Sequence, residues 1–265
     1  MHGSAPHRLR HSLIALLADT GRLWRLAAAA VAQGIAGPFR GQRSRPRETV
    51  QQVLRAGNAS LPLVALIAAL VGLILALQSA YQLRRLGALD LVADLVAVSV
   101  TRELGPLMTA ILVAGRVGSA IAAELGTMKV SEEIDALTVI GIDPVSFLVV
   151  PRLAGLLIAV PCLTLFADAV AILSGCAVGV LVLEQGAIGY LMDSVAILEL
   201  QDLWGGVLKA LAFGGIIGLV GCQQGLDTDG GAEEVGRSTT AAVVRSIVLI
   251  IGADLFVTAL LFVSP

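Results

Sequence analysis

The sequence predicts an all-α integral membrane protein with five membrane-spanning helices, an N-terminal amphipathic interfacial helix and a short cytoplasmic helix. Of its 265 residues, 57% are hydrophobic and only 14% are charged, which is far too apolar for an ordinary soluble domain. The apolar residues gather in runs of about 20 or more, whereas buried strands run about 4–8 residues. The net charge of −2 gives no bulk basicity, so nucleic acid is not an expected partner.

The first 50 residues form a basic region ahead of the first span. Residues 1–55 contain nine arginines but only one aspartate and one glutamate. Residues 9–36 set apolar side chains such as Trp24 against arginines, which predicts a helix that lies in the membrane interface. A signal peptide is the alternative, but its apolar core would be short and would be interrupted by Asp19.

Residues 51–265 form the predicted membrane domain, with five apolar segments. The first has no charge over residues 56–83, which exceeds the roughly 20 residues that a spanning helix needs. The other four each contain at least one charged residue. The predicted spans are residues 59–83, 91–115, 153–182, 203–225 and 243–263.

Lysines and arginines are divided unequally between the two sides of such a bundle. Five spans place the N-terminus on the same side as residues 124–152 and 226–242, and these segments, with Arg245 at the start of the fifth span, hold 13 lysines and arginines. The opposite side has only Arg84 and Arg85. The positive-inside rule therefore predicts a cytoplasmic N-terminus.

A compact polar helix is predicted at residues 129–137, between the second and third spans. Ser131 is a candidate N-cap before Glu132 and Glu133, whose charges suit the positively polarised end of a helix. Apolar residues at helical spacing, among them Leu137, form one face. This segment is either a solvated loop helix or a docking element for a partner, and its short apolar stripe between two spans favours docking.

No catalytic motif is present in the sequence. The three histidines fall within the first 11 residues, and no His, Cys and Glu cluster has metal-ligand spacing. The three cysteines lie in apolar segments and are interpreted as small buried hydrophobes. Neither lysine has the Gly-Lys-Ser/Thr context of a phosphate-binding loop, so we expect no cofactor here and assign any ATP hydrolysis to another chain.

Charged residues inside the spans are the candidate functional groups. A charge near the bilayer centre costs about 2.5–3.5 kcal/mol on insertion scales, so it normally faces a partner or a cavity. Arg102, Glu103 and Lys209 either pair with protein groups or contact a polar group of a substrate. Asp168 and Asp254 are expected to be structural intramembrane charges.

Two long blocks resemble the MlaE/YrbE permeases, the membrane subunits of ABC transporters in MCE-type (Mla) lipid-transport systems. RELGPLMTAILVAGRVGSAIAAELGTMKVSEEIDALTVIGIDP, residues 102–144, resembles the signature region of this family. GGAEEVGRSTTAAVVRSIVLIIGADLFVTALLF, residues 230–262, resembles its C-terminal segment. Lys209, ahead of a glycine-rich stretch, also fits, and the resemblance covers roughly residues 50–265.

This resemblance implies a homodimeric permease of the bacterial inner membrane, without enzyme activity of its own, that works with a cytoplasmic ATPase. A periplasmic hexamer of MCE-domain proteins and a STAS-domain protein are further implied partners, and phospholipid moved between the inner and outer membranes is the implied substrate. The residues implied to couple to the ATPase are Glu124, Lys129, Glu132, Glu133, Asp135 and Leu137. The residues placed near a lipid pocket at the dimer interface are Gln78, Tyr81, Arg102, Glu103 and Lys209.

Three alternatives remain open from the sequence. Gln78 and Tyr81 could simply anchor the end of the first span at the interface, where tyrosine is common. The whole chain could be an ion-coupled secondary transporter with Asp168, Glu103 and Asp254 as a proton relay, although no inverted repeat is evident. It could also be a scaffold that transports nothing and only anchors a cytoplasmic partner.

Overall fold

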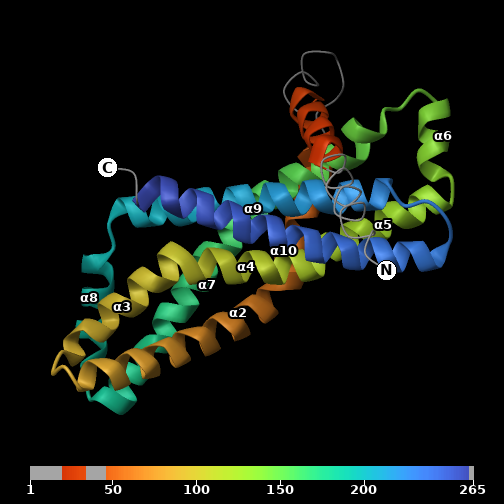
Figure 1. Cartoon of the computed structure of the whole chain (residues 1–265). Helices are drawn as coiled ribbons and strands as arrows, with labels where there is room; N and C mark the ends of the chain where they lie inside the picture. The colour runs from red at the N-terminus through yellow and green to blue at the C-terminus, as the bar shows by residue number, and fades with distance from the viewer. Residues whose placement is uncertain (1–19, 34–45, 263–265) are drawn as a thin grey trace, which may run out of the picture.

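The computed structural model describes residues 20–33 and 46–262, and every regular element in these ranges is a helix (Figure 1). The predicted all-α class is confirmed, and five helical stretches are long and apolar enough to span a membrane. The second is much longer than the predicted 91–115, because charged residues near its end do not interrupt the helix. The five stretches are Arg47–Arg84, Leu89–Val130, Val145–Leu183, Leu200–Leu226 and Ala232–Leu261.

The first span is α2 (Pro46–Arg84), which runs parallel to α7 (Val150–Leu183) and packs along its length. Glycines allow the close approach: a Cβ on Gly155 would lie 2.7 Å from Gln52, and a Cβ on Gly72 would overlap the carbonyl oxygen of Ala171. The predicted division of the chain after residue 50 falls inside α2, which continues across it without a break.

The second span is a composite of six segments. Two of them are π-helical turns, and in the first of these the Gly105 N–H bonds to the Val100 carbonyl five residues earlier. Such turns hold one residue more than an α-helical turn and are frequent at functional sites. The segments are η2 (Leu89–Leu91), α3 (Val92–Ser99), η3 (Val100–Leu104), α4 (Gly105–Val113), η4 (Ala114–Gly118) and α5 (Ser119–Val130).

A sharp corner joins α5 to the short helix α6 (Glu133–Val139). Ser131 continues the last turn of α5, with its N–H bonded to the Thr127 carbonyl at 2.9 Å. Glu132 follows in the left-handed conformation with φ of 59°, and no side chain caps α6. The predicted N-cap role of Ser131 is therefore wrong, because the chain turns one residue later than the capping pattern suggested.

The remaining helices complete a bundle with α6 at one end and α8 (Ala187–Ile197) at the other (Figure 1). A π-turn, η5 (Val145–Val149), leads into α7. Helix α9 (Leu200–Leu226) runs parallel to the second span, and α10 (Ala232–Phe262) packs on α9 and α5. We refer below to the α6 end and the α8 end of this bundle.

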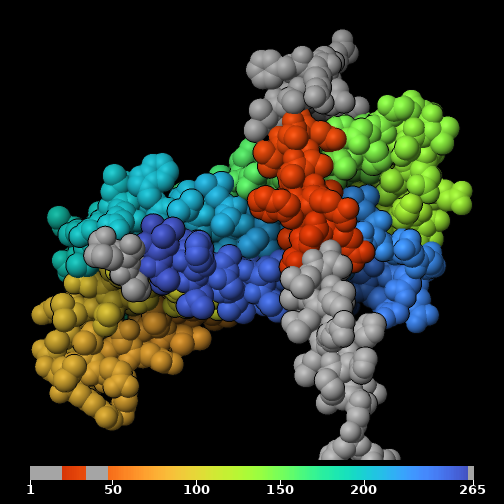
Figure 2. Space-filling model, turned by 45° about the horizontal axis from the view of Figure 1, so that its top comes forward, coloured from red at the N-terminus to blue at the C-terminus, as the bar shows by residue number. Residues whose placement is uncertain are grey.

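The helix over residues 20–33 crosses the direction of α9 and α10 (Figures 1 and 2). Ala30 is buried and Leu26 packs against the core, whereas Trp24 is 76% exposed. Arg22 forms an ion pair at 3.6 Å with Asp227 at the end of α9. Residues 9–19 and 34–36 of the predicted amphipathic helix lie outside the described residues, and its location in the membrane interface stays a prediction.

Candidate functional site

Lys209 of α9 is completely buried within the bundle, at 0% exposure. Its ammonium donates to the Arg102 carbonyl at 3.0 Å, forms an ion pair with Asp254 Oδ1 at 3.0 Å and binds the Glu103 carboxylate. Two of these contacts, to the Arg102 carbonyl and the Glu103 carboxylate, are hydrogen bonds, and the third, to Asp254, is an ion pair. The buried cation therefore joins three helical segments, η3, α9 and α10.

Glycine spacing on α9 explains why Lys209 reaches the second span. Gly206 lies one turn before it, and a Cβ there would stand only 2.7 Å from the Thr101 carbonyl oxygen. The two backbones therefore approach at this level more closely than side chains would permit. The π-helical turn η3 then presents Arg102 and Glu103 to α9.

Arg102 and Glu103 bind different partners, as expected for adjacent residues that point about 100° apart on a helix. Arg102 Nε lies 2.6 Å from Asp202 Oδ1, and Asp202 is only 1% exposed. Asp202 also accepts from the Glu199 N–H at 3.2 Å, closing a capping box at the start of α9. Sequence reasoning missed Asp202, although an acidic residue at the third position of a helix is a recognisable capping signal.

Helix α10 completes the group through Asp254 and Thr258. The Thr258 hydroxyl donates to Glu103 Oε1 at 3.2 Å. We name the set Arg102, Glu103, Asp202, Lys209, Asp254 and Thr258 the ion-pair cluster.

The ion-pair cluster has a closed side and an open side. The side chains of Lys209 and Asp202 are 0% and 1% exposed, whereas those of Arg102 and Glu103 are 38% and 40% exposed. Arg102 and Glu103 are therefore accessible at the surface, while Lys209 is bonded to Glu103 from the buried side.

Gln78 and Tyr81 lie apart from the ion-pair cluster, near the α8 end of α2. Both are exposed, and the Tyr81 hydroxyl accepts a hydrogen bond from Arg85. The Arg85 guanidinium carbon also stands 4.7 Å from the centre of the Tyr81 ring. Among the described residues, neither Gln78 nor Tyr81 hydrogen-bonds to the cluster, so the structure brings together three of the five predicted pocket residues.

Asp168 occupies a separate buried position in α7, with 6% exposure. A Cβ on Gly105 would overlap its carboxylate, so the absence of a side chain at Gly105 makes room for it. Within the described part of the chain, Asp168 Oδ1 has no hydrogen-bond partner. No hydrogen bond in these ranges links Asp168 to Glu103 or Asp254, as a three-carboxylate relay would require.

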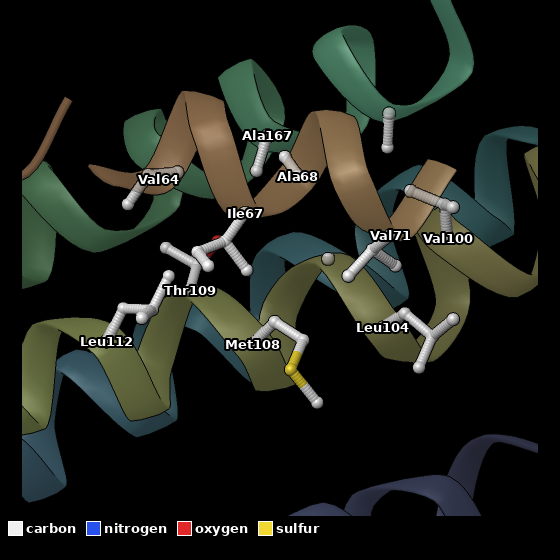
Figure 3. A pocket seen from close by; sticks show the side chains of 12 residues that line it. Val64, Ile67, Ala68, Val71, Val100, Leu104, Met108, Thr109, Leu112 and Ala167 are labelled. Carbon is white, nitrogen blue, oxygen red and sulfur yellow. The ribbon is translucent and has the colours of Figure 1, made fainter. Parts of the chain in front are cut away.

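The enclosed cavity between α2, α4 and α7 is small and apolar (Figure 3). Its volume of about 20 Å³ accommodates about one water molecule. Ile67, Met108 and Leu112 are among the residues that line it, with Thr109 as a polar neighbour. This cavity is far too small for the acyl chains of a lipid.

At the α6 end, two ion pairs involve three of the six residues predicted to couple to a partner. Lys129 binds Asp135 at 3.0 Å across the corner, and Glu124 binds Arg152 of α7 at 3.1 Å. Leu137 is half-buried against the core. The exposed coupling candidates of this corner are Glu132, Glu133 and Asp135, with Val139 and Ile140 at 86% and 68% exposure.

The three cysteines differ in their surroundings. Cys176 and Cys222 are buried, as predicted, but Cys162 is exposed on α7. The prediction for Cys162 is therefore wrong, because an apolar membrane helix has one face outside the bundle where a small hydrophobe also fits. No group of three or more His, Cys, Asp and Glu within residues 20–33 and 46–262 is arranged to hold a metal ion.

Comparison with known proteins places the chain in a family. The family described as permease MlaE matches residues 49–260. A Rickettsia typhi protein described as a probable ABC transporter permease is 43% identical over 213 residues, which cover 80% of this chain and 82% of its own length. A Synechocystis protein with the same description is 37% identical over 220 residues, covering 83% and 84%.

A plant protein is similarly related. The chloroplastic protein TRIGALACTOSYLDIACYLGLYCEROL 1 of Arabidopsis thaliana is 40% identical over 222 residues, which cover 82% of this chain and 62% of the plant protein. The family match covers the first block, all but the last two residues of the second block, and all the residues of the ion-pair cluster. This multi-pass membrane protein therefore belongs to the MlaE permease family.

Proposed function

We propose that this protein is the permease subunit of an ABC transporter that moves phospholipids between the inner and outer membranes. The observation that carries the proposal is the ion-pair cluster, which opens to the surface of an otherwise apolar bundle through Arg102 and Glu103. A phospholipid has one anionic head and two apolar tails. A surface cation bordered by apolar helices suits such a molecule.

A second copy of the chain completes the lipid pocket in this proposal. The enclosed cavity described in one chain holds about 20 Å³, which cannot accommodate a lipid. Arg102 and Glu103 are partly exposed and so remain available to a pocket formed between two copies. A homodimer with Gln78 and Tyr81 near the α8-end mouth of this pocket is the arrangement that we propose.

The proposal is tested by the phospholipid that the purified complex retains after exchange into lipid-free detergent. We expect mass spectrometry to detect bound phospholipid. The double variant Arg102→Gln, Asp202→Asn removes the surface cation without leaving an unpaired carboxylate, and its lipid retention should fall about tenfold, because a hydrogen bond to a charged group contributes about 1.5–3 kcal/mol. Absence of retained lipid from an intact unmodified complex would refute the proposal.

The α6 end faces the cytoplasm in this proposal, because the positive-inside rule places the more basic side there. Helix α6 then docks on an ATPase subunit, which binds the ATP, and a STAS-domain protein contacts that ATPase. The α8 end faces the periplasm of a bacterial inner membrane and meets a hexamer of MCE-domain proteins. The short charged α6, held to α5 by Lys129 and Asp135, supports the docking role.

Substitutions on the exposed side of α6 should release the ATPase. We expect Glu133→Lys and Val139→Asp each to reduce ATPase recovery in a pull-down by at least tenfold, because both positions are exposed and one would reverse a charge while the other removes an apolar contact. Asp193→Lys, an exposed charge reversal on α8, is the matched control and should bind normally. If both α6 variants retain the ATPase, another surface performs the docking.

A further inference from the structure

Arg116 is a cation within the second span that faces outward from the bundle. It belongs to the π-helical turn η4, and its side chain is exposed. Across the described ranges, its guanidinium makes no hydrogen bond or ion pair with another residue. The helical stretch Leu89–Val130 has 42 residues, about twice the roughly 20 that cross a bilayer, and the predicted span ends at residue 115, just before Arg116. Arg116 is therefore placed at the head-group level, where an anionic group from outside this chain can bind its exposed guanidinium.

A surface hollow surrounds Arg116 between α2 and the second span. It is shallow and widely open to the surface, and its volume is about 590 Å³. The Ser119 hydroxyl is already bonded to the Gly115 carbonyl at 2.6 Å, and no neighbour lies within 4 Å of a Cβ built on Gly115. We name this hollow the Arg116 groove, and its lining residues are Leu63, Ile111, Leu112, Gly115, Arg116 and Ser119.

The Arg116 groove is apolar toward the middle of the bundle and polar toward the α6 end. Ile111 and Leu112 precede Arg116 along a span that runs from the α8 end to the α6 end, and Ser119 follows it. A lipid of the leaflet at the α6 end has the same polarity, with its head toward that end and its tails toward the bilayer centre. The long arginine side chain can extend its charge toward the head-group level.

Neighbouring carboxylates on the same span do not supply the missing partner. Glu103 is bound to Lys209, and Glu124 is bound to Arg152. Because a second copy has the same residues in the same pairs, these two carboxylates are occupied there as well. Charge complementarity favours an anionic group at Arg116, and the apolar residues that line the rest of the groove suit the tails of a phospholipid.

We propose that the Arg116 groove binds the phosphate head of a phospholipid from the leaflet at the α6 end, with the acyl chains along Leu63, Ile111 and Leu112. The inference rests on the proposed lipid-transport function and adds a second head-group position to it. This position lies 13 residues, about 20 Å along the helix, from Glu103 of the ion-pair cluster. A permease with both sites holds lipid heads at two depths of the same span.

The test uses the whole transporter in vesicles of phosphatidylethanolamine and radiolabelled phosphatidylglycerol, with a photo-crosslinking residue in place of Ser119. We expect lipid crosslinking that falls about tenfold in Arg116→Gln and is retained in Arg116→Lys. Arg85→Gln, an exposed arginine at the other end of the bundle, should leave crosslinking unchanged. Added inorganic phosphate should not compete, because the groove holds the tails as well as the head.

Three results would overturn the inference. They are equal lipid crosslinking in Arg116→Gln, loss of crosslinking on addition of inorganic phosphate, and a crosslink to a second protein copy in place of lipid. Measuring the lipid that the purified complex retains distinguishes failure of this inference from failure of the proposed function. If the complex retains lipid but crosslinking is unchanged in Arg116→Gln, only the proposed groove site is refuted. If lipid is absent from both measurements, the proposed function is refuted as well.

Discussion

Replacing Lys209 with methionine is expected to destabilise the protein by about 3–5 kcal/mol and to abolish lipid transport. The substitution leaves the carboxylates of Glu103 and Asp254 beside each other without the cation that they share. Removing one partner of a buried ion pair is costly because the remaining charge stays buried and unpaired. Thermal unfolding of the purified chain in detergent measures the first effect, and vesicle-to-vesicle lipid transfer by the whole complex measures the second.

A matched control and a rescue separate stability from function at Lys209. Lys129→Met also removes a lysine from an ion pair, but that pair is partly exposed, so the loss should be about 0–1 kcal/mol. The triple variant Lys209→Met, Glu103→Gln, Asp254→Asn removes the unpaired charges and should regain most of the stability without regaining transport. Recovery of transport in the triple variant would show that the ion-pair cluster is purely structural.

Gly72→Ala is expected to separate α2 from α7 and to lower stability by about 1–3 kcal/mol. The added methyl group would overlap the backbone carbonyl oxygen of Ala171, which cannot move aside as a flexible side chain can. Because α2 packs mainly along α7, this contact holds the first span in the bundle. Thermal unfolding in detergent, with limited proteolysis of α2 as a second measurement, tests the expectation.

The same helix provides the control for this glycine. Gly57 also lies in α2, but a Cβ there would meet no atom within 4 Å. Gly57→Ala should therefore leave stability unchanged or raise it slightly, since alanine has the higher helix propensity. An equal loss from both variants would mean that the close α2–α7 contact at Gly72 is not the cause of the loss.

The number of spans was predictable from the sequence because long apolar runs have few alternatives in a folded chain. Charged residues inside those runs also marked Arg102, Glu103 and Lys209, which the structure brings together. The length of the second span was not predictable. In the sequence Arg116 and Glu124 indicate the end of an apolar run, whereas in the structure the helix continues through both residues. Hydropathy measures apolar character, whereas a helix can continue beyond an apolar segment into polar sequence.

Pairing between distant segments was the other feature that the sequence did not reveal. Asp202 binds Arg102 across 100 positions of the chain, and nothing in its own neighbourhood indicates that partner. The resemblance placed Gln78 and Tyr81 near the same pocket as the cluster, yet they lie near the α8 end of α2 on a different part of the surface. Depth follows from the order of the spans, whereas lateral position depends on how the helices pack.

The left-handed residue at the α5–α6 corner has a mechanical consequence. Glycine would adopt the φ of 59° at Glu132 without strain, but it would adopt many other angles equally well. A residue with a side chain has a far narrower range of backbone angles, and the Lys129–Asp135 ion pair braces the bend from the side. Because the corner has few alternative backbone conformations, a force applied to α6 would be transmitted to α5 instead of only changing the angle between the two helices.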